Sequence, residues 1–383
     1  MKQALFFLLS LVFLSSCSTL ESWQSRTGEN RVFEARNLWV KRTTAFENLG
    51  FRKISRMKPI LYKNWVIEAN GLDGIAAYNA QTGAEKWRLP ILNGAEPSAT
   101  LINDRIFIGA SDGQFYCIHA ETGNVLWSFP TRIENLSEPL LHEGTLYFLT
   151  GSNSVYALDA ATGKQLWLYT RQDPASLSIR GGSKPAIRNG TIYVGFSDGA
   201  VVALLAANGA VKWEKQLSKN KKFRDLDSDP VIDGDFLYLL GYDDQTYCLR
   251  AATGDLVWKA DLDGYGSILM AADRLLFATS NGQFVALNKE TGAKIWSYTL
   301  KSGIATSASL YKGTVVFGES QGSLRILESG TGKEMASYNP GKGILSPPSV
   351  DEKNGVAYFI SNEANLYAIK IGWVRAPAIP YLR

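Results

Sequence analysis

The side chains that usually perform catalysis or hold metal ions are sparse in this sequence. Its 383 residues include two histidines, His119 and His142, and three cysteines, Cys17, Cys117 and Cys248. A zinc site needs three or four His, Cys or carboxylate ligands, and general acid–base catalysis most often uses histidine. No two of the cysteines are adjacent. We therefore expect no catalytic centre, no metal site and no cofactor.

A different group of residues is suited to binding a protein. The segment PASLSIRGG, residues 174–182, places Leu177 and Ile179 on alternate positions before Arg180. In an extended segment both aliphatic side chains project to the same side. Arginine offers a planar head with several donors and is enriched at interface hot spots. A later segment contains Asp225 and Asp227, which could orient the guanidinium or meet basic groups of a partner. The alternative is a self-packed loop with an internal Arg–Asp pair.

An internal repeat places these segments in the fold. NAQTGAEKW, HAETGNVLW, DAATGKQLW and later variants recur at spacings of 40, 40, 46, 45, 38 and 40 residues, counted between their turn glycines. A period near 40 indicates a propeller or a solenoid. Each unit reads as four short strands rich in β-branched and aromatic residues, separated by glycine turns. Four antiparallel strands per unit are typical of a propeller blade, and the capping repeats of a solenoid are not visible.

Tryptophan occupies a fixed place in the repeat, four residues after the turn glycine, and the seventh unit has Ala336 there instead. Six equivalent positions around a ring cannot all face one ligand, so we expect these tryptophans to pack between neighbouring blades rather than to stack on a cofactor. The six residues are Trp87, Trp127, Trp167, Trp213, Trp258 and Trp296.

The last unit is incomplete, and the N-terminus supplies what it lacks. Residues 344–371 contain three strand-like segments, whereas residues 37–43 form a lone strand before the first full blade. Pairing the two would cover an exposed sheet edge and would put Trp39 at the missing tryptophan position. The sequence therefore predicts an all-β, eight-bladed propeller of four-stranded antiparallel blades over residues 37–372, closed by the N-terminal strand. Residues 373–383 would form a C-terminal tail.

Two connections between blades are longer than the others. We counted residues from the turn glycine of one blade to the first hairpin glycine of the next blade. This distance is 21 residues for the glycines at 123 and 144, and also for those at 292 and 313. It is 27 residues for the glycines at 163 and 190, and 25 residues for those at 209 and 234. The additions fall between blades three and four and between blades four and five, where Arg180 and Asp227 lie. Such connections emerge on one face, so we expect a local patch there.

The N-terminus has the pattern of a secreted, lipidated protein. Lys2 precedes an apolar run from Ala4 to Leu14, too short to span a bilayer stably. Leu14-Ser15-Ser16-Cys17 resembles a bacterial lipobox, which predicts a signal peptide over residues 1–16, lipidation of Cys17 and a flexible tether over residues 17–36. Since Ser18 rather than Asp follows the cysteine, we expect the periplasmic face of the outer membrane. The alternative is an ordinary secretory signal with an incidental cysteine.

The repeat resembles that of pyrroloquinoline-quinone dehydrogenases over nearly all of residues 57–371. This resemblance is specific for the fold and weak for the activity. Many of those enzymes hold the quinone with an adjacent cysteine pair and a calcium site, and this sequence has no adjacent cysteines. Cys117 and Cys248 fall at the same repeat position in blades two and five, and we expect both to pack as small apolar side chains.

The lipobox, the eight repeats and the two long connections together resemble the propeller lipoproteins of the outer-membrane β-barrel assembly machine. The resemblance implies a non-catalytic scaffold that docks on the periplasmic POTRA domains of BamA, the barrel subunit, and works with other subunits on unfolded outer-membrane proteins. It implies that the docking residues are Leu177, Ile179, Arg180, Asp225 and Asp227, with Ile179 standing where leucine is usual. A formal net charge of +4 from 76 charged residues gives no indication of nucleic acid as a partner.

Two other functions remain open at this point. One is a ligand-binding or sensory propeller, which would have a central channel lined by converging polar groups. The other is a degenerate quinoprotein oxidoreductase, which a quinone chromophore in the purified protein would reveal.

Overall fold

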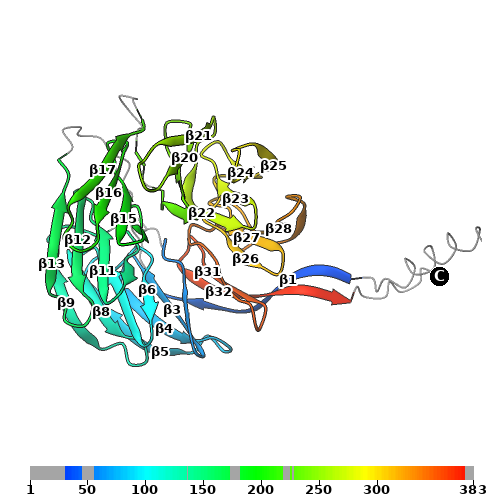
Figure 1. The fold of residues 1–383 in the computed structure, drawn as a ribbon. Helices are drawn as coiled ribbons and strands as arrows, with labels where there is room; N and C mark the ends of the chain where they lie inside the picture. Colours follow the sequence, from blue (N-terminus) through cyan, green and yellow to red (C-terminus); the bar gives the residue numbers. More distant parts are fainter. Residues whose placement is uncertain are drawn as a thin grey trace, which may run out of the picture. The chain divides into compact units, whose positions relative to one another are not determined.

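The computed structural model describes residues 31–44, 56–135, 137–172, 182–218, 225–226 and 228–375. All regular structure in these residues is β, arranged as eight four-stranded sheets (Figure 1). The predicted all-β fold with eight four-stranded blades is confirmed. Blades one to seven each use four consecutive strands, and blade eight uses three strands from the C-terminal region and one from the N-terminal region.

Each blade begins with a strand that follows the connection from the preceding blade, and in most blades this first strand is short. These strands are β2 (Ile60–Tyr62), β6 (Thr100–Ile102), β10 (Leu140–His142), β14 (Ala186–Arg188), β18 (Val231–Asp233), β22 (Tyr265–Ala271), β26 (Ser309–Tyr311) and β30 (Ser349–Asp351).

The second and third strands form the middle of each blade. The second strands are β3 (Trp65–Asn70), β7 (Arg105–Gly109), β11 (Thr145–Leu149), β15 (Thr191–Gly195), β19 (Phe236–Leu240), β23 (Arg274–Ala278), β27 (Thr314–Gly318) and β31 (Val356–Ile360). The third strands are β4 (Gly74–Asn79), β8 (Gln114–His119), β12 (Ser154–Asp159), β16 (Ala200–Leu205), β20 (Thr246–Arg250), β24 (Gln283–Asn288), β28 (Leu324–Glu328) and β32 (Asn365–Arg375).

The fourth strand is the outermost one in each sheet. These strands are β5 (Glu85–Pro90), β9 (Val125–Pro130), β13 (Gln165–Thr170), β17 (Val211–Gln216), β21 (Leu256–Ala260), β25 (Lys294–Thr299), β29 (Glu334–Tyr338) and, in blade eight, β1 (Arg31–Arg42).

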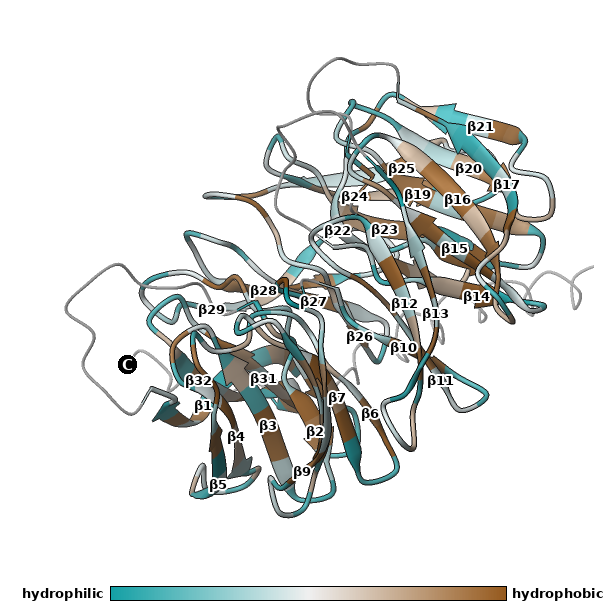
Figure 2. Cartoon of the chain, turned by 90° about the vertical axis from the view of Figure 1, so that its left-hand side faces the viewer, coloured by the Kyte–Doolittle hydropathy of each residue, from teal (hydrophilic) through white to brown (hydrophobic). Residues whose placement is uncertain are grey.

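Burial follows the position of a strand within its blade. Middle strands such as β15 and β16 are buried along almost their whole length, because both faces pack against neighbouring blades. The outer strand β17, by contrast, alternates partly buried and exposed residues. Figure 2 shows the same contrast, with apolar colouring on β15 and β16 and polar colouring along β17. The core is thus a series of apolar layers between blades.

Tryptophan and glycine of the repeat meet at the joints between blades. Each indole Nε1 donates to a turn carbonyl of the next blade over 2.8–3.2 Å. The turn glycine of that blade has φ between 70° and 74° and lies so close that a Cβ would come within 2.5–2.9 Å of the ring. Glycine is therefore required twice, for its backbone conformation and for the contact. The pairs are Trp39–Gly83, Trp87–Gly123, Trp127–Gly163, Trp167–Gly209, Trp213–Gly254, Trp258–Gly292 and Trp296–Gly332.

Ala336 departs from the repeat for a topological reason. It pairs with Ile326 at the place where Trp296 pairs with Ala286 in the preceding blade. The tryptophan of one blade covers the turn between the third and fourth strands of the next. In blade eight those strands, β32 and β1, come from opposite ends of the chain, so no such turn exists there. A tryptophan at position 336 would have no turn glycine to cover.

The N-terminal strand closes the ring, as predicted, because β1 joins β32 in the sheet of blade eight. Trp39 donates to the carbonyl of Ala80 in blade one over 3.0 Å. At the end of the strand, the amide and the hydroxyl of Thr43 both donate to the carbonyl of Ala364, over 2.9 and 2.8 Å. The seam between the two ends of the chain is therefore bonded on both sides of β1.

The two paired strands run further than the sequence indicates. Residues 35–371 form one compact unit, which is the propeller. In the second unit, the structure describes residues 31–34 and 372–375, the N-terminal end of β1 and the C-terminal end of β32. There the rings of Phe33 and Trp373 meet edge to face with centroids 5.4 Å apart. Strand β1 thus includes residues 31–36, which the sequence placed in the tether. Strand β32 includes residues 373–375, which the sequence placed in the tail. Cys17 and residues 376–383 lie outside the described residues.

Candidate functional site

The two long connections predicted from the sequence are present. Fifteen residues separate Thr170 from Ala186, at the step from blade three to blade four. Fourteen separate Gln216 from Val231, at the next step, whereas nine separate Pro130 from Leu140. We call the connections of residues 171–185 and 217–230 the first and the second long crossover. Leu177, Ile179, Arg180 and Asp227 lie outside the described residues.

The first long crossover starts from a fixed point. Arg171 donates from Nε to Asp198 over 2.6 Å, and its guanidinium lies 3.0 Å from the carboxylate of Glu214 and over the ring of Phe196. Its amide donates to the carbonyl of Asn153 over 3.0 Å. The side chain of Arg171 is 15% exposed, so these bonds form away from most of the solvent. The start of the crossover is held to blade four before the proposed docking residues begin.

The second long crossover is anchored in its middle. Leu226 is fully buried among apolar residues of blades four and five, and its amide donates to the carbonyl of Phe196 over 3.1 Å. Asp225 is 2% exposed, and its carbonyl accepts the amide of Tyr242 over 3.1 Å. The side chain of Asp225 is therefore buried rather than exposed on the surface of the crossover.

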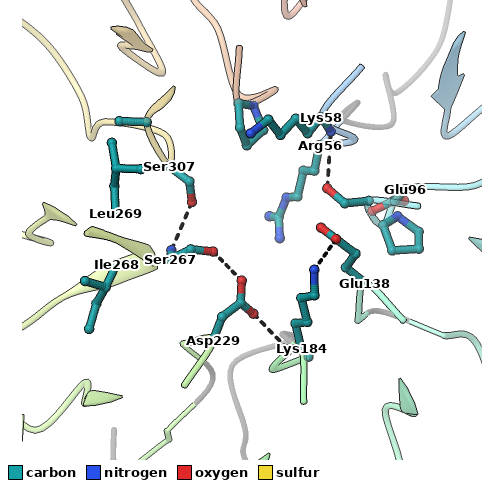
Figure 3. Close-up of a pocket in the computed structure, with 15 residues that line it drawn as sticks. Arg56, Lys58, Glu96, Glu138, Lys184, Asp229, Ser267, Ile268, Leu269 and Ser307 are labelled. Carbon is teal, nitrogen blue, oxygen red and sulfur yellow. Dashed lines mark hydrogen bonds and ion pairs between the residues drawn. The ribbon is translucent and has the colours of Figure 1, made fainter. Parts of the chain in front are cut away.

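The ends of the two long crossovers are joined by hydrogen bonds that the sequence analysis missed. The amide of Lys184 donates to Oδ1 of Asp229 over 2.7 Å, and the hydroxyl of Ser267 donates to Oδ2. The ammonium of Lys184 forms an ion pair with Glu138, and the amide of Ser267 donates to the hydroxyl of Ser307 over 2.9 Å. Figure 3 shows these bonds side by side. They link five successive blades, from the third to the seventh.

These residues line a cavity of about 460 Å³ where the first strands of the blades begin. Every blade contributes at least one residue, which places the cavity on the axis of the ring, and we call it the axial cavity. Because its lining residues end the connections between blades, it opens on the side of the long crossovers. The charged residues of its wall are Arg56, Lys58, Glu96, Glu138, Lys184 and Asp229.

Burial changes the acidity of two groups on this wall. It raises the pKa of Asp229, an effect that the bonds from Ser267 and Lys184 oppose. It lowers the pKa of Lys58, and the nearby charge of Lys184 adds to that effect while Glu138 opposes it. Both shifts have the sign expected when a charged group loses water.

Cys117 and Cys248 do not line this cavity. Cys117 and Cys248 are free and buried at equivalent places in blades two and five, opposite Trp127 and Trp258. Burial raises their pKa values to about 11 and about 12, which keeps both thiols protonated and unreactive. Across the described ranges no group of three or more His, Cys, Asp or Glu side chains could hold a metal ion. The same residues contain no helix long and apolar enough to cross a membrane.

Comparison with protein families decides between the propeller classes. A family profile described as outer membrane protein assembly factor BamB matches residues 72–298 and 230–373, which together cover most of the propeller. The chain belongs to the BamB family. The match extends over both long crossovers and over every residue that lines the axial cavity except Arg56 and Lys58, so it covers most of the propeller and not single repeats.

Named relatives agree with this assignment. BamB of Shewanella oneidensis is 26% identical over 368 residues, which are 90% of this chain and 93% of the relative. BamB of Escherichia coli is 26% identical over 382 residues, 92% of this chain and 97% of the relative. Both carry the name of an assembly factor, in keeping with the prediction that the chain is not an enzyme.

Solved structures show how widely the fold is shared. The crystal structure of BamB from Moraxella catarrhalis is similar with a TM-score of 0.74 at 20% identity, covering 88% of this chain and 99% of that one. A europium-containing methanol dehydrogenase is similar with a TM-score of 0.72 at 12% identity, covering 88% of this chain and 93% of the enzyme. The fold alone thus does not distinguish BamB proteins from dehydrogenases.

Proposed function

We propose that this chain is a non-catalytic lipoprotein scaffold of the outer-membrane β-barrel assembly machine, which docks on the periplasmic POTRA domains of BamA and assists the folding and insertion of outer-membrane proteins. The observation that carries the proposal is its membership of the BamB family over most of the propeller. The pair of long crossovers at neighbouring steps of the ring supports a localised docking surface.

The proposed surface combines an apolar and a charged part. Leu177 and Ile179 would supply apolar area, and Arg180 would act as the central anchor, since buried arginines and apolar side chains dominate many interfaces. Asp227 would meet basic groups of the partner or orient Arg180. Asp225 would act from inside the crossover, because its side chain is buried.

Binding to purified POTRA domains tests the docking residues. The Arg180→Ala variant should weaken binding by about 2–4 kcal/mol, roughly 30- to 1000-fold in Kd, as expected for a central arginine. Its free energy of unfolding should change by less than about 0.5 kcal/mol, the range of uncoupled surface sites. Calorimetric titration beside a thermal melt of each variant measures both quantities.

Two further variants sharpen this test. Leu177→Ala should weaken binding through lost apolar contact, whereas Lys221→Ala, which we expect at the rim of the interface, should mainly slow association and alter its salt dependence. Wild-type affinity in Arg180→Ala, or a loss explained by early melting, would favour the self-packed loop instead.

We also propose that the protein is anchored through lipid on Cys17 at the periplasmic face of the outer membrane. More than one acyl chain is needed for stable anchoring, and lipidation at a lipobox cysteine supplies them. Cys17→Ala should leave an unlipidated precursor and remove the protein from outer-membrane fractions, as measured by fractionation and mass spectrometry. Equal recovery of the variant and the wild type in those fractions would point to another anchor.

A further inference from the structure

The charged groups of the axial cavity divide into two sets. Lys184, Glu138 and Asp229 bind one another through an ion pair and a backbone hydrogen bond. Arg56, Lys58 and Glu96 form no ion pair with any residue that the structure describes. The second set carries one net positive charge. In Figure 3 the guanidinium of Arg56 points into the cavity, and Lys58 lies beside it.

Lys58 is the more unusual of the two cations. Its side chain is half-buried, and burial lowers the pKa of its ammonium. A cation that has lost water without gaining a counter-ion raises the free energy of the folded state. The charges that act on it come from Glu138 and Lys184, and that carboxylate and that ammonium are already paired with each other. A bound anion would therefore meet an unsatisfied positive charge.

We propose that the axial cavity binds a carboxylate group, held by Arg56 and Lys58. The planar guanidinium fork matches the two oxygens of a carboxylate, and the lysine adds a point charge. Glu96, Glu138 and Asp229 line the same cavity and would repel a doubly charged phosphate, so a single negative charge fits better. The volume of about 460 Å³ lies in the range of small-ligand sites.

The carboxylate could belong to a small organic acid or to an acidic side chain of a polypeptide that reaches into the ring. Both sources present the same chemistry to Arg56 and Lys58. Arg56 and Lys58 are not among the residues of the proposed docking surface, so titration of their variants tests this inference separately from binding to POTRA domains.

Direct titration of the full mature chain tests the site. The probes are acetate and propionate for the small-molecule source, a short end-blocked peptide with one glutamate for the polypeptide source, and inorganic phosphate for comparison. We expect saturable binding of at least one carboxylate probe by calorimetry and a rise in melting temperature with its concentration. Whichever carboxylate probe binds more tightly identifies the source. Phosphate binding as tight as that of the better carboxylate probe would overturn the assigned chemistry.

Variants connect the binding to the named residues. Lys58→Met and Arg56→Gln should each weaken carboxylate binding at least tenfold, and Glu96→Gln should strengthen it because a like charge is removed. Lys164→Met is the matched control, since Lys164 is an exposed lysine on the hairpin between β12 and β13, outside the cavity wall, and should leave the affinity unchanged. Absence of saturable binding, or equal affinity in Arg56→Gln and the wild type, would overturn the proposal.

Proton uptake gives a readout that a merely structural role of Lys58 would not change. A bound anion favours the protonated ammonium, so binding at alkaline pH should take up protons, seen as a binding enthalpy that depends on the buffer. The uptake should disappear in Lys58→Met. If that variant does not fold, Lys58→Gln carries the same comparison, whereas Arg56→Gln, which keeps the lysine, should still take up protons when it binds. Identical proton uptake in the wild type and the lysine variant would also count against the site.

Discussion

At the scale of single residues, the tryptophan–glycine contact is the recurring joint of the ring. Trp167 is 9% exposed, donates to the carbonyl of Ala206 over 2.8 Å and packs on Gly209. The joint combines apolar burial with a satisfied indole N–H, which is how buried tryptophans are usually accommodated.

Replacing Trp167 by alanine should destabilise the propeller by about 3–5 kcal/mol, the usual cost of truncating a buried aromatic side chain. The neighbouring Leu166, 53% exposed on the same strand, is the matched control and should change the free energy of unfolding by less than about 0.5 kcal/mol as Leu166→Ala. Chemical unfolding followed by circular dichroism measures both. Similar effects of the two substitutions would mean that the joint contributes little.

Glu68 breaks the pattern of the core. Its place in the second strand corresponds, through the strand registers, to apolar residues in all seven other blades. Glu68 is fully buried, neither carboxyl oxygen has a hydrogen-bond partner among the described residues, and burial raises its pKa well above the usual value. Arg88 opposes this shift, whereas Asp73 and Glu85 add to it. The equivalent residues are Ile108, Phe148, Val194, Leu239, Phe277, Phe317 and Phe359.

The raised pKa of Glu68 makes stability depend on pH. The folded state binds the proton of the Glu68 carboxyl group more tightly than the unfolded state does. Protonation therefore stabilises the fold fully at pH values below the pKa of the unfolded chain, and this stabilisation is lost as pH rises through the pKa of the folded state. Glu68→Leu should therefore stabilise the propeller, by about 1–3 kcal/mol for the removed unsatisfied group, and by more at pH 8 than at pH 5. Glu68→Gln should flatten the pH dependence without the full gain. Unfolding free energies at both pH values test this, and an equal gain at each would contradict it.

At the scale of elements, Asp229 holds the ends of two connections together. It accepts the amide of Lys184 at the end of the first long crossover, and it lies near the end of the second. Without this carboxylate the partly buried amide of Lys184 loses its partner, which costs up to about 1–3 kcal/mol. Both crossovers should then open more often.

Limited trypsin digestion measures this opening, because Arg180 and Lys219 lie within the two long crossovers. Asp229→Ala should speed cleavage at both positions, whereas Asp229→Asn, which keeps an acceptor oxygen for the amide of Lys184, should change it less. Cleavage faster at only one position, or equal in all three proteins, would show that the two crossovers are not coupled through Asp229.

The closing strand is the second element with a direct test. Deletion of residues 31–43 would uncover the edge of β32, and exposed edge strands pair with other chains. The truncated protein should aggregate or be digested rapidly, as followed by size-exclusion chromatography and proteolysis. Full solubility with an unchanged melting temperature would contradict the observed closure.

At the scale of the whole molecule, the repeat made most of the fold predictable. Six of the blades repeat a glycine turn followed four residues later by tryptophan, and the spacing of these turns predicted the number of blades. The incomplete last unit then predicted that the N-terminal strand closes the ring. The bonds of Asp229 were not predictable, because Lys184 lies 45 residues away in sequence and approaches it only through the curvature of the ring. The isolation of Glu68 and the added length of β1 likewise depend on neighbours that are distant in sequence.

Closure through β1 also sets an order of events during synthesis. The strand that completes blade eight is the first to leave the ribosome, yet its partner β32 is the last. Until β32 is made, β1 has no partner strand, and the sheet that holds Trp39 over the turn of blade one is not yet formed. Pairing of strands from opposite ends of the chain is slow, because the chain must lose the entropy of loop closure before the strands form any stabilising contact. A nascent chain of this protein therefore stays an open, incomplete ring until β32 has been synthesised.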